Sequence, residues 1–510
     1  MTLHDLIERT GLEVEQDVNG DLLAAAVSGI AYDSRAVNGG EVFVAIKGEC
    51  HDGMAFVDHA LSRGAIAVVA EVARSIPVSR PWLRVADARA ALAALAATFH
   101  GNPSHELLVI GTTGTNGKTT TTYLIEAILE QAGIPCGRIS SVSYRISEEE
   151  QPALHTTPEA PELQTLLSKM VKENRQACVM EVSSHALAMK RVLQTRFGAA
   201  VFTNLTRDHL DFHGDMTKYF QAKRKLFSMI CKTSPAVLNM DDLYGKTLIS
   251  EVAWPVTYAI DQVADVMPER LVYSLDGIEM NAQTTQGSLR LRSRLLGRGN
   301  AYNVLAATAT GTALSIPSSA IEKGIAAVEH VPGRMQLASR NDDDVTVLVD
   351  FAHTDDALRS LLETSRSITR GRIITVFGCG GDRDSTKRPL MGAVASRLSD
   401  LVIVTSDNPR SEDPEHIAKE IITGLKYKEG DDAITESDGL KYAQTPWLTI
   451  LNRDEAIGYA IREADAGDLV VIAGKGHEQY QLIGTRTVPF DDTAIAREAL
   501  IARRSSASIG

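Results

Sequence analysis

The residues with the clearest chemistry are Lys118 and Thr119, which follow a glycine-rich turn. The apolar segment 107–111 reads LLVIG and leads into TTGTNGKTTTTYLIEAILEQ, a turn followed by a long helical pattern. This order of strand, glycine loop and helix is typical of phosphate binding, because backbone N–H groups can surround an anion at the positive end of a helix. Lys118 can then reach the terminal phosphates, and the Thr119 hydroxyl can hold Mg²⁺. Thr112 replaces the first glycine of the strict motif, so a glycine turn with an exposed lysine stays open as the alternative.

Acidic and histidine side chains form a second candidate site. Glu181 lies in the apolar segment ACVMEV, and His209 lies in TNLTRDHLDFHGD. If the two segments are neighbouring parallel strands, their carboxyl ends open into the crevice where such sheets bind ligands. Glu181 and His209 are therefore predicted to hold a divalent ion near the phosphate loop. Without that context, the stretch from Asp208 to Asp211 more often caps a helix with a solvated acid.

The elements that must position these residues suggest three domains. A chain of 510 residues corresponds to about three domains at roughly 150 residues each. Turn-rich joints occur at HGNPS, directly after an alanine-rich helical run, and at VPG, after another helical run. The predicted domains are residues 1–101, 102–333 and 334–510.

The predicted fold class is α/β. GEVFVAI and GAIAVVA read as buried strands of a mixed α/β amino-terminal domain, and LLVIG, ACVMEV and AAVFTNL alternate with helices in a central domain. VTVLVDFAH, RIITVFG, DLVIVTS and DLVVIAG repeat that alternation after the second joint. Such alternation favours largely parallel sheets, with a Rossmann-like carboxyl-terminal domain. The final segment, ARRSSASIG, is predicted to be disordered.

Composition excludes several classes of protein. Lys and Arg number 52 against 65 Asp and Glu, a net charge of −13, which would repel a phosphate backbone. Nucleic acid is therefore not an expected partner. The first residues, MTLHDLIERTGLEVEQD, lack the basic start and apolar run of a signal peptide, and no apolar stretch is long enough to span a membrane. Five scattered cysteines argue against a disulfide scaffold. We expect a cytoplasmic protein without membrane insertion.

Many motifs occur in one order along nearly the whole chain. They are DSR at 33–35, TGTNGKTT at 113–120, HTTPEA at 155–160, MEVSSHAL at 180–187, FTNLTRDHLDFHGD at 202–215, GRGNAYNVLAA at 297–307, PGRM at 332–335, DFAHTDDAL at 350–358, GCGGDRDSTKRPLMG at 378–392, DNPRSEDP at 407–414 and AGKGHEQYQ at 473–481. Together they resemble the Mur ligase family, which builds peptidoglycan precursors. An ordered series of this kind is far more specific than the phosphate loop alone.

The resemblance implies an ATP-dependent amide ligase. It implies that meso-2,6-diaminopimelate is added to the D-glutamate of UDP-N-acetylmuramoyl-L-alanyl-D-glutamate through an acyl phosphate, with Mg²⁺ as the metal. The catalytic residues it implies are Lys118, Glu181, His209 and Lys223. Positioning and charge neutralisation would carry most of the acceleration, since several anionic groups meet in this reaction.

The resemblance also implies a modified lysine. In the family, a helix lysine carboxylated by CO₂ binds a second magnesium ion, and the Ala-Lys step in YFQAKRKLF selects Lys223. The metal ligands would be Thr119, Glu181, His209 and Lys223 as its carbamate (N6-carboxylysine). Because a carbamate forms only on a deprotonated amine, Lys223 is expected to be partly buried. From sequence alone, a helix lysine is usually exposed.

The nucleotide pocket implied by the family lies between the central and last domains. The ATP-binding residues it implies are Gly114, Thr115, Asn116, Gly117, Lys118, Thr119, Thr120, Asn300, Asn303, Arg334, Asp350 and His353. The side-chain amides of Asn300 and Asn303 suit the edge of an adenine ring. Arg334 would contact a phosphate, and Asp350 would accept hydrogen bonds from the ribose hydroxyls. Asn303 as a helix cap and Asp350 as a turn residue stay open as alternatives.

The amino-terminal domain would bind the UDP end of the substrate. The residues implied for the UDP-N-acetylmuramoyl-dipeptide are Ser34, Asn116, Thr156, Thr157, Ser183 and Arg191. The chain departs from the family pattern at Met189, where glutamine is common, and at Gln336, where glutamate is usual. Neither position belongs to the predicted reaction centre.

The DNPR segment carries the prediction of which amino acid is added. Meso-diaminopimelate differs from lysine by a carboxylate beside its distal amine, and a buried carboxylate calls for a guanidinium such as Arg410. The implied binding residues are Arg388, Asp407, Asn408, Pro409, Arg410, Gly474 and Glu478. Arg388 would bind the other carboxylate of diaminopimelate. Asp407 and Glu478 would bind its ammonium group. An Asn-Pro turn with a surface arginine is the alternative.

Three rival functions stay open at this stage. They are the same ligation with L-lysine, a folylpolyglutamate synthetase-like ligase, and a nucleotide-dependent switch without ligation. Folate enzymes are not expected to carry DNPR or a UDP-binding domain, and a switch needs no Lys223 carbamate. The expected partners are small-molecule substrates, and the chain is expected to act as a monomer.

Overall fold

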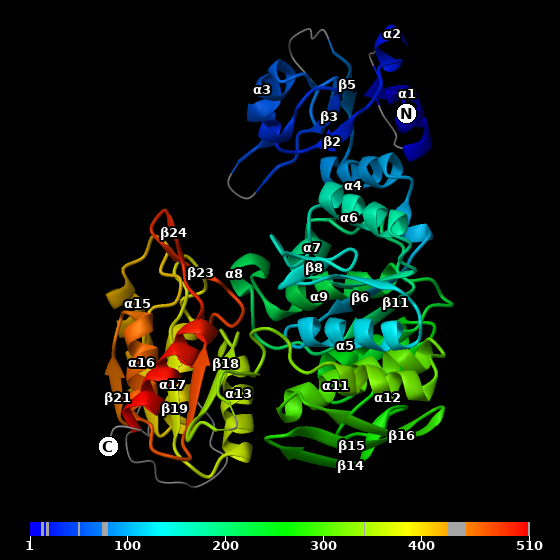
Figure 1. Cartoon of the computed structure of the whole chain (residues 1–510). Helices are drawn as coiled ribbons and strands as arrows, with labels where there is room; N and C mark the ends of the chain where they lie inside the picture. The colour runs from blue at the N-terminus through cyan, green and yellow to red at the C-terminus, as the bar shows by residue number, and fades with distance from the viewer. Residues whose placement is uncertain are drawn as a thin grey trace.

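The computed structural model describes the chain apart from residues 12–14, 17–19, 49–50, 74–79, 341, 427–444 and 508–510. Figure 1 shows an N-terminal body at the top, a central body below it and a C-terminal body beside the central one. In the described residues, their main sheets have five, eight and six strands respectively. No helix in this part of the chain is long and apolar enough to cross a lipid bilayer.

The N-terminal body contains the sheet β1-β5-β4-β3-β2, in which only β1 runs antiparallel to its neighbour. Its elements are α1 (Leu3–Thr10), β1 (Glu15–Gln16), α2 (Gly20–Leu23), β2 (Gly29–Ala31), β3 (Glu41–Val44), α3 (Val57–Ser62), β4 (Ala67–Ala70), β5 (Trp82–Arg84) and α4 (Ala88–Phe99). The Asp87 side chain caps α4 by accepting from the N–H of Ala90. The alanines of α4 let it pack closely both on this sheet and against α6 (Ala160–Lys172) of the central body.

The central body is built on the sheet β13-β12-β11-β6-β10-β7-β8-β9, in which only β8 runs opposite to the other strands and therefore pairs antiparallel with both β7 and β9. Its strands are β6 (Leu108–Thr113), β7 (Cys136–Ile139), β8 (Ser143–Arg145), β9 (Glu150–Pro152), β10 (Ala177–Glu181), β11 (Ala199–Phe202), β12 (Ala236–Asn239) and β13 (Pro255–Tyr258). The helices α5 (Lys118–Gln131), α11 (Gly297–Ala313) and α12 (Ser318–Ala327) bury one face of the sheet. The helices α6, α7 (Ser184–Ala188) and α9 (Met216–Ser228) bury the other. The predicted parallel strands are confirmed.

A small antiparallel sheet in the central body was not predicted. It consists of β14 (Met267–Ser274), β15 (Gly277–Thr284) and β16 (Gly287–Ser293). Buried and exposed residues alternate along β16, as expected for a strand with one face on a core. This buried face packs on α12, so the sheet extends the core on the α5 side of the central body.

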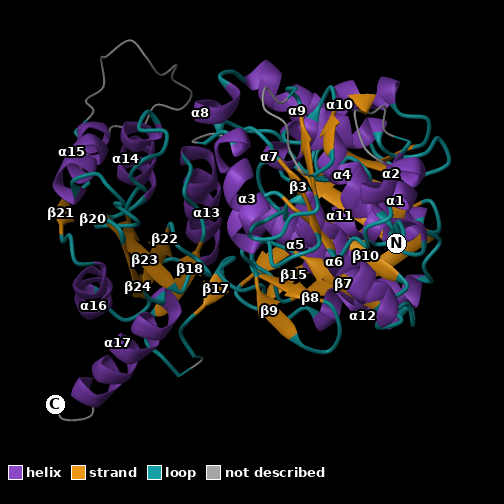
Figure 2. Cartoon of the chain, turned by 90° about the horizontal axis from the view of Figure 1, so that it is seen from above, coloured by secondary structure: helices purple, strands orange, loops and turns teal. Residues whose placement is uncertain are grey.

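The C-terminal body has the sheet β17-β18-β22-β19-β20-β21, in which the four predicted strands all run parallel. Its strands are β17 (Gln336–Leu337), β18 (Thr346–Asp350), β19 (Ile373–Phe377), β20 (Leu401–Val404), β21 (Trp447–Thr449) and β22 (Leu469–Ala473), with the hairpin β23 (Tyr480–Ile483) and β24 (Arg486–Pro489). Its helices are α13 (Asp355–Ile368), α14 (Lys387–Leu398), α15 (Pro414–Leu425), α16 (Arg453–Glu463) and α17 (Asp492–Ala507). Helix α13 packs against α11, and Figure 2 shows it on the side that faces the central body.

The prediction of a disordered tail is wrong for most of that segment. Residues 502–507 continue α17, and 508–510 lie outside the described residues. Arg503 donates to Asp344 and to the carbonyls of Ile461 and Ala464, and Arg504 pairs with Asp343. These contacts with distant segments order the tail, and its serine-rich composition could not reveal them.

A fully buried ion pair joins the starts of α16 and α17. Arg453 donates to both carboxylate oxygens of Asp492 at 2.8 and 2.7 Å, and both side chains are 0% exposed. We expect Asp492→Asn to destabilise the protein by about 3 kcal/mol, because it leaves a guanidinium buried without a counter-charge. Thermal unfolding of the variant measures the loss.

The control is Asp465→Asn. Asp465 is 83% exposed and pairs with Arg372, so this change should alter the free energy of unfolding by less than about 1 kcal/mol. Equal effects of the two changes would contradict the prediction.

Candidate active site

The phosphate loop connects β6 to α5 and depends on two glycines. Gly114 and Gly117 have φ angles of +150° and +86°, which residues with a side chain rarely adopt. A Cβ atom at Gly114 would clash with the Thr203 hydroxyl, and one at Gly117 would clash with the Asn303 amide. The loop is thus a tight backbone turn at the amino end of α5, as phosphate binding requires.

Two lysine side chains meet at one carbonyl of this loop. The Nζ atoms of Lys118 and Lys223 lie 3.0 and 2.7 Å from the Gly114 oxygen. Lys223 is 1% exposed, so the burial expected of it is observed. That burial, together with the nearby Lys118 charge, holds the pKa of Lys223 well below its usual range. Burial lowers the pKa of Lys118 as well, against the opposing charges of Glu181 and Asp208. A buried amine that loses its proton easily is suited to react with CO₂.

Glu181 and His209 flank the phosphate loop from either side. The sequence analysis took β10 and β11 as neighbouring strands. In the structure they lie on opposite sides of β6 and are not adjacent to each other. Glu181 is buried and its Oε1 atom accepts from the N–H of Ser141 at 2.7 Å. The His209 Nε2 atom lies 3.4 Å from Asp208. Burial lowers the pKa of His209 despite the Asp208 charge, so the ring is neutral near pH 7 and has a lone pair to offer.

Three of the four predicted donors around the loop are oxygen ligands of the kind that Mg²⁺ prefers, and the fourth, the His209 ring, is a nitrogen. Within the described residues, no group of three or more His, Cys, Asp or Glu side chains is placed to hold a metal by itself. The predicted ligands instead combine the Glu181 carboxylate and the neutral His209 ring with two groups of other types, the Thr119 hydroxyl and a modified Lys223. Oxygen donors suit Mg²⁺, which also uses phosphate oxygens of a bound nucleotide.

The linker arginine reaches into the phosphate loop from the start of the C-terminal body. Arg334 donates to the Thr119 hydroxyl at 3.1 Å, and its guanidinium lies 4.6 Å from the centre of the Phe351 ring. Asp350 accepts from the N–H groups of Met335 and Ala352, both at 2.7 Å. Burial raises the pKa of Asp350, although the Arg334 charge opposes this. The structure therefore brings Arg334 and Asp350 close to the loop, as expected for a nucleotide pocket.

Three further nucleotide candidates, Asn300, Asn303 and His353, already have partners within the chain. Asn303 donates to Asn300 at 3.0 Å, and Asn300 donates to the Leu296 carbonyl at 2.8 Å. The His353 ring is 2.9 Å from the Phe351 carbonyl, and its Nε2 atom is 3.9 Å from Asp208 of the central body. These residues lie around the loop, but contact with adenine stays a prediction for them.

Most residues predicted to bind the muramoyl-dipeptide lie together beside Glu181. Thr157 donates to the Glu181 carbonyl at 2.9 Å and accepts from the N–H of Ser183 at 3.0 Å. Arg191 donates to the Thr157 carbonyl at 3.1 Å and pairs with Glu159 at 2.8 Å. Thr156 precedes Thr157 and is partly buried. The Met189 sulfur atom lies 3.5 Å from a terminal nitrogen of Arg191. At this position the glutamine that is common in the family would offer a polar group.

Two predicted binding residues lie apart from this group. Ser34 is in the N-terminal body, where its hydroxyl is 2.9 Å from the His59 Nδ1 atom. Asn116, in the phosphate loop, donates to Asp356 of α13 at 3.3 Å and so contacts the C-terminal body. Gln336, the other departure from the family pattern, accepts from the N–H of Gly333 at 2.9 Å.

The residues predicted to bind the amino acid come from two loops of the C-terminal body. Asn408 donates to the Glu478 carboxylate at 2.8 Å. Asp407 lies close to Gly474. A Cβ atom added at Gly474 would lie only 2.5 Å from the Asp407 Oδ2 atom. Asp407, Asn408 and Pro409 are buried and Arg410 is partly buried, with a φ of +51° and a 2.7 Å hydrogen bond to the Gly381 carbonyl. Burial and the nearby Arg383 charge lower the pKa of Arg410, against the opposing charges of Asp407 and Glu478.

Arg388 has carboxylate partners within the chain itself. It is 1% exposed, and its terminal nitrogens donate to Glu412 at 2.9 Å and to Glu420 at 2.6 Å. A substrate carboxylate would have to compete with both glutamates for the guanidinium. Its predicted role in substrate binding therefore gains no support from its contacts.

Sequence reasoning missed Ser141, which connects several candidate residues. Its N–H donates to Glu181, its hydroxyl lies 3.1 Å from that of Thr119, and its carbonyl is 3.0 Å from the His477 ring. Burial and the nearby Arg334 charge lower the pKa of His477 to about 4. The sequence analysis did not predict the strand before Ser141, and only the structure shows that this strand ends at the same edge of the sheet as the phosphate loop.

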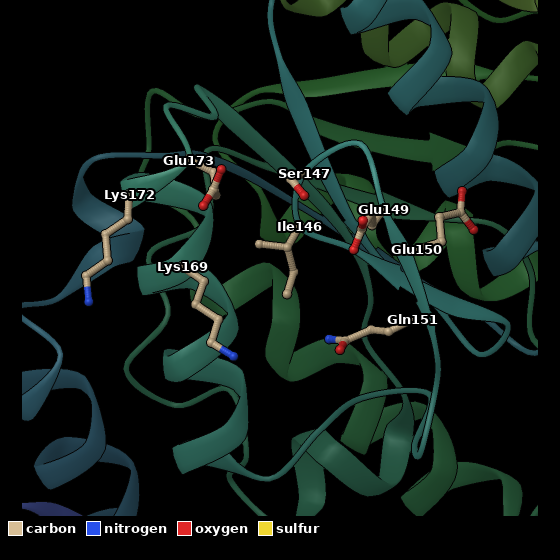
Figure 3. A pocket seen from close by; sticks show the side chains of 8 residues that line it. All are labelled: Ile146, Ser147, Glu149, Glu150, Gln151, Lys169, Lys172 and Glu173. Atoms are coloured by element: carbon tan, nitrogen blue, oxygen red, sulfur yellow. The ribbon is translucent and has the colours of Figure 1, made fainter.

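A separate shallow pocket lies on the central body beside β9 and α6 (Figure 3). The residues that line it are Ile146, Ser147, Glu149, Glu150, Gln151, Lys169, Lys172 and Glu173. None of them belongs to the predicted site, and acidic and basic side chains are mixed around it.

The fold and site define an α/β nucleotide-binding protein with a phosphate loop. Comparison with known families matches residues 26–100 to the Mur ligase family, catalytic domain, residues 112–311 to the Mur ligase middle domain, and residues 333–476 to the Mur ligase, glutamate ligase domain. The chain belongs to the Mur ligase family.

Individual relatives cover almost the whole chain. It is 47% identical to the UDP-N-acetylmuramoyl-L-alanyl-D-glutamate--2,6-diaminopimelate ligase of Geobacter metallireducens, over 93% of this chain and 94% of that protein. It is 46% identical to the protein of the same name from Gloeobacter violaceus, over 99% of each. A solved structure of a ligase with this name superposes with a TM-score of 0.67 at 32% identity, over 99% of both chains.

Proposed function

We propose that this protein is the ATP-dependent ligase that joins meso-2,6-diaminopimelate to the D-glutamate of UDP-N-acetylmuramoyl-L-alanyl-D-glutamate, a step in peptidoglycan precursor synthesis. The observation that carries the proposal is the DNPR turn, in which a partly buried Arg410 lies beside Asp407 and Glu478. Both relatives described above carry the name of this activity. A guanidinium beside two carboxylates suits an amino acid whose far end holds both a carboxylate and an ammonium.

The proposed reaction has two steps. The D-glutamate carboxylate attacks the γ-phosphorus of ATP, which forms an acyl phosphate and releases ADP. The amine of diaminopimelate then attacks the acyl carbon, the amide bond forms, and inorganic phosphate and a proton leave. Lys118 and Arg334 would neutralise the phosphate oxygens, and the backbone N–H groups of the loop would hold them in place.

The proposed metal is Mg²⁺, held by Thr119, Glu181, His209 and the carbamate of Lys223. When bound, it would neutralise charge on the transferred phosphoryl group. What favours Lys223 is its burial and its position 2.7 Å from the Gly114 carbonyl. His209 would bind through its neutral ring, and Glu181 would be oriented by the N–H of Ser141.

The remaining roles are proposals of the same kind. ATP would lie between the central and C-terminal bodies, against Asn300, Asn303, Asp350 and His353. The UDP end of the substrate would lie on the N-terminal body near Ser34. We also propose domain boundaries at 101 and 333, a cytoplasmic location and a monomer.

Phosphate release tests the proposed function. The protein is incubated with ATP and Mg²⁺, with and without UDP-N-acetylmuramoyl-L-alanyl-D-glutamate, and with either meso-diaminopimelate or L-lysine. We expect release to require both the nucleotide-linked dipeptide and diaminopimelate. Release that depends on L-lysine instead would assign the rival substrate, and hydrolysis without any amino acid would indicate a switch.

A further inference from the structure

A buried lysine that is not among the predicted site residues lies in the loop that carries Gly474 and Glu478. Lys475 follows β22, between Gly474 and Gly476, and its side chain is 0% exposed. Its Nζ atom is 3.1 Å from the Asn408 Oδ1 atom and 3.1 Å from the Glu478 Oε2 atom. An ammonium is rarely buried unless it has partners that satisfy it, so these two contacts account for its position.

Lys475 adds a charged contact between two loops that are also joined by backbone hydrogen bonds from Arg410 to Leu482 and from Gly484 to Arg410. The DNPR loop follows β20 and the loop with Glu478 follows β22, and β19 lies between these strands. Asn408 also donates to the Glu478 Oε2 atom at 2.8 Å, which closes a network of three side chains. The Asn408 Oδ1 atom that accepts from Lys475 also accepts from the N–H of Leu482. The ammonium thus sets the orientation of both the Asn408 amide and the Glu478 carboxylate.

The charge of Lys475 also balances the site. Three carboxylates, those of Asp382, Asp407 and Glu478, are matched by three cations, Arg383, Arg410 and Lys475. The neighbouring guanidinium of Arg388 is paired with Glu412 and Glu420, and that of Arg453 with Asp492. A site with equal numbers of the two charges suits a zwitterion, whereas a site with one more carboxylate would suit a lone ammonium.

We propose that Lys475 is a positioning residue that also determines specificity. Its ammonium orients Glu478 and Asn408 and removes the excess negative charge that would otherwise favour an amino acid with a bare distal amine, such as L-lysine. This inference rests on the proposed function, because it concerns the far end of diaminopimelate.

The variant Lys475→Met keeps the length of the side chain and removes its charge. We expect KM for diaminopimelate to rise about tenfold, with KM for ATP changed less than about twofold, since the change removes the ammonium between Asn408 and Glu478 and leaves the phosphate loop untouched. The ratio of kcat/KM for L-lysine to that for diaminopimelate should rise by about tenfold or more. The matched control is Lys419→Met, an exposed lysine of α15 in the same body that pairs with Glu415. It should change none of these quantities.

The outcomes separate the two proposals. If the wild-type protein releases no phosphate with diaminopimelate, the proposed function fails and this inference fails with it. If the wild type is active but Lys475→Met keeps its KM and its substrate ratio, or raises all three substrate KM values alike, only the inference fails. Should the methionine variant not fold, Glu478→Gln, which preserves shape, replaces it. It should raise KM for diaminopimelate without raising the lysine ratio, and a raised ratio would overturn the inference.

Discussion

Lys223→Ala should reduce turnover at least about 100-fold, because it removes a group proposed to hold Mg²⁺ where charge develops on the phosphate. The Lys223 amine lies under the phosphate loop, 2.7 Å from the Gly114 carbonyl, and burial keeps its pKa far below that of a surface lysine. Phosphate release under saturating substrates measures the loss. A second readout does not depend on activity. In ¹³C-labelled bicarbonate, the wild type should show a carbamate signal by NMR that the variant lacks.

The matched control for this change is Lys225→Ala. Lys225 lies two residues along the same helix, α9, and is exposed. It should leave both turnover and the carbamate signal unchanged. Near-normal activity of Lys223→Ala, or a carbamate signal that survives the substitution, would show that the lysine has no such role.

Arg410→Ala should weaken the use of diaminopimelate by about 2–5 kcal/mol in kcat/KM, because the distal carboxylate would be left without its guanidinium partner. In the structure this side chain is partly buried and is tied to the Gly381 carbonyl at 2.7 Å, so it is held in place before substrate arrives. The KM for ATP should stay within about twofold of the wild type, since the phosphate loop is on another body. Steady-state kinetics with each substrate varied in turn measures both effects.

Arg397→Ala is the control for this second change, because Arg397 is an exposed arginine in the last turn of α14 in the same body. It should leave KM for diaminopimelate unaltered. An unchanged KM for diaminopimelate in Arg410→Ala would remove the argument for specificity, whereas a large rise in KM for ATP would move Arg410 to the nucleotide pocket.

Local patterns in the sequence were sufficient for the strands and loops that carry the chemistry. The apolar runs that became β6, β10, β19 and β22 were predicted because a strand buried on both faces needs a continuous run of apolar residues. The phosphate loop was predicted because its glycines and the following Lys-Thr pair are close in sequence. The family was predicted from the order of its motifs, and the comparisons confirm it.

The tertiary structure alone decided which of these residues meet. Lys118 and Lys223 share the Gly114 carbonyl although Lys223 is 109 residues away from it in sequence. Lys475 contacts Asn408, 67 residues away, and α17 extends to residue 507, with Arg503 bound to Asp344, 159 residues away. The sequence by itself determined the family, the α/β class and the residue types available for catalysis. Burial, the pKa of Lys223 and the charge balance around Glu478 depend on contacts between distant segments, which periodicity and motif spacing do not encode.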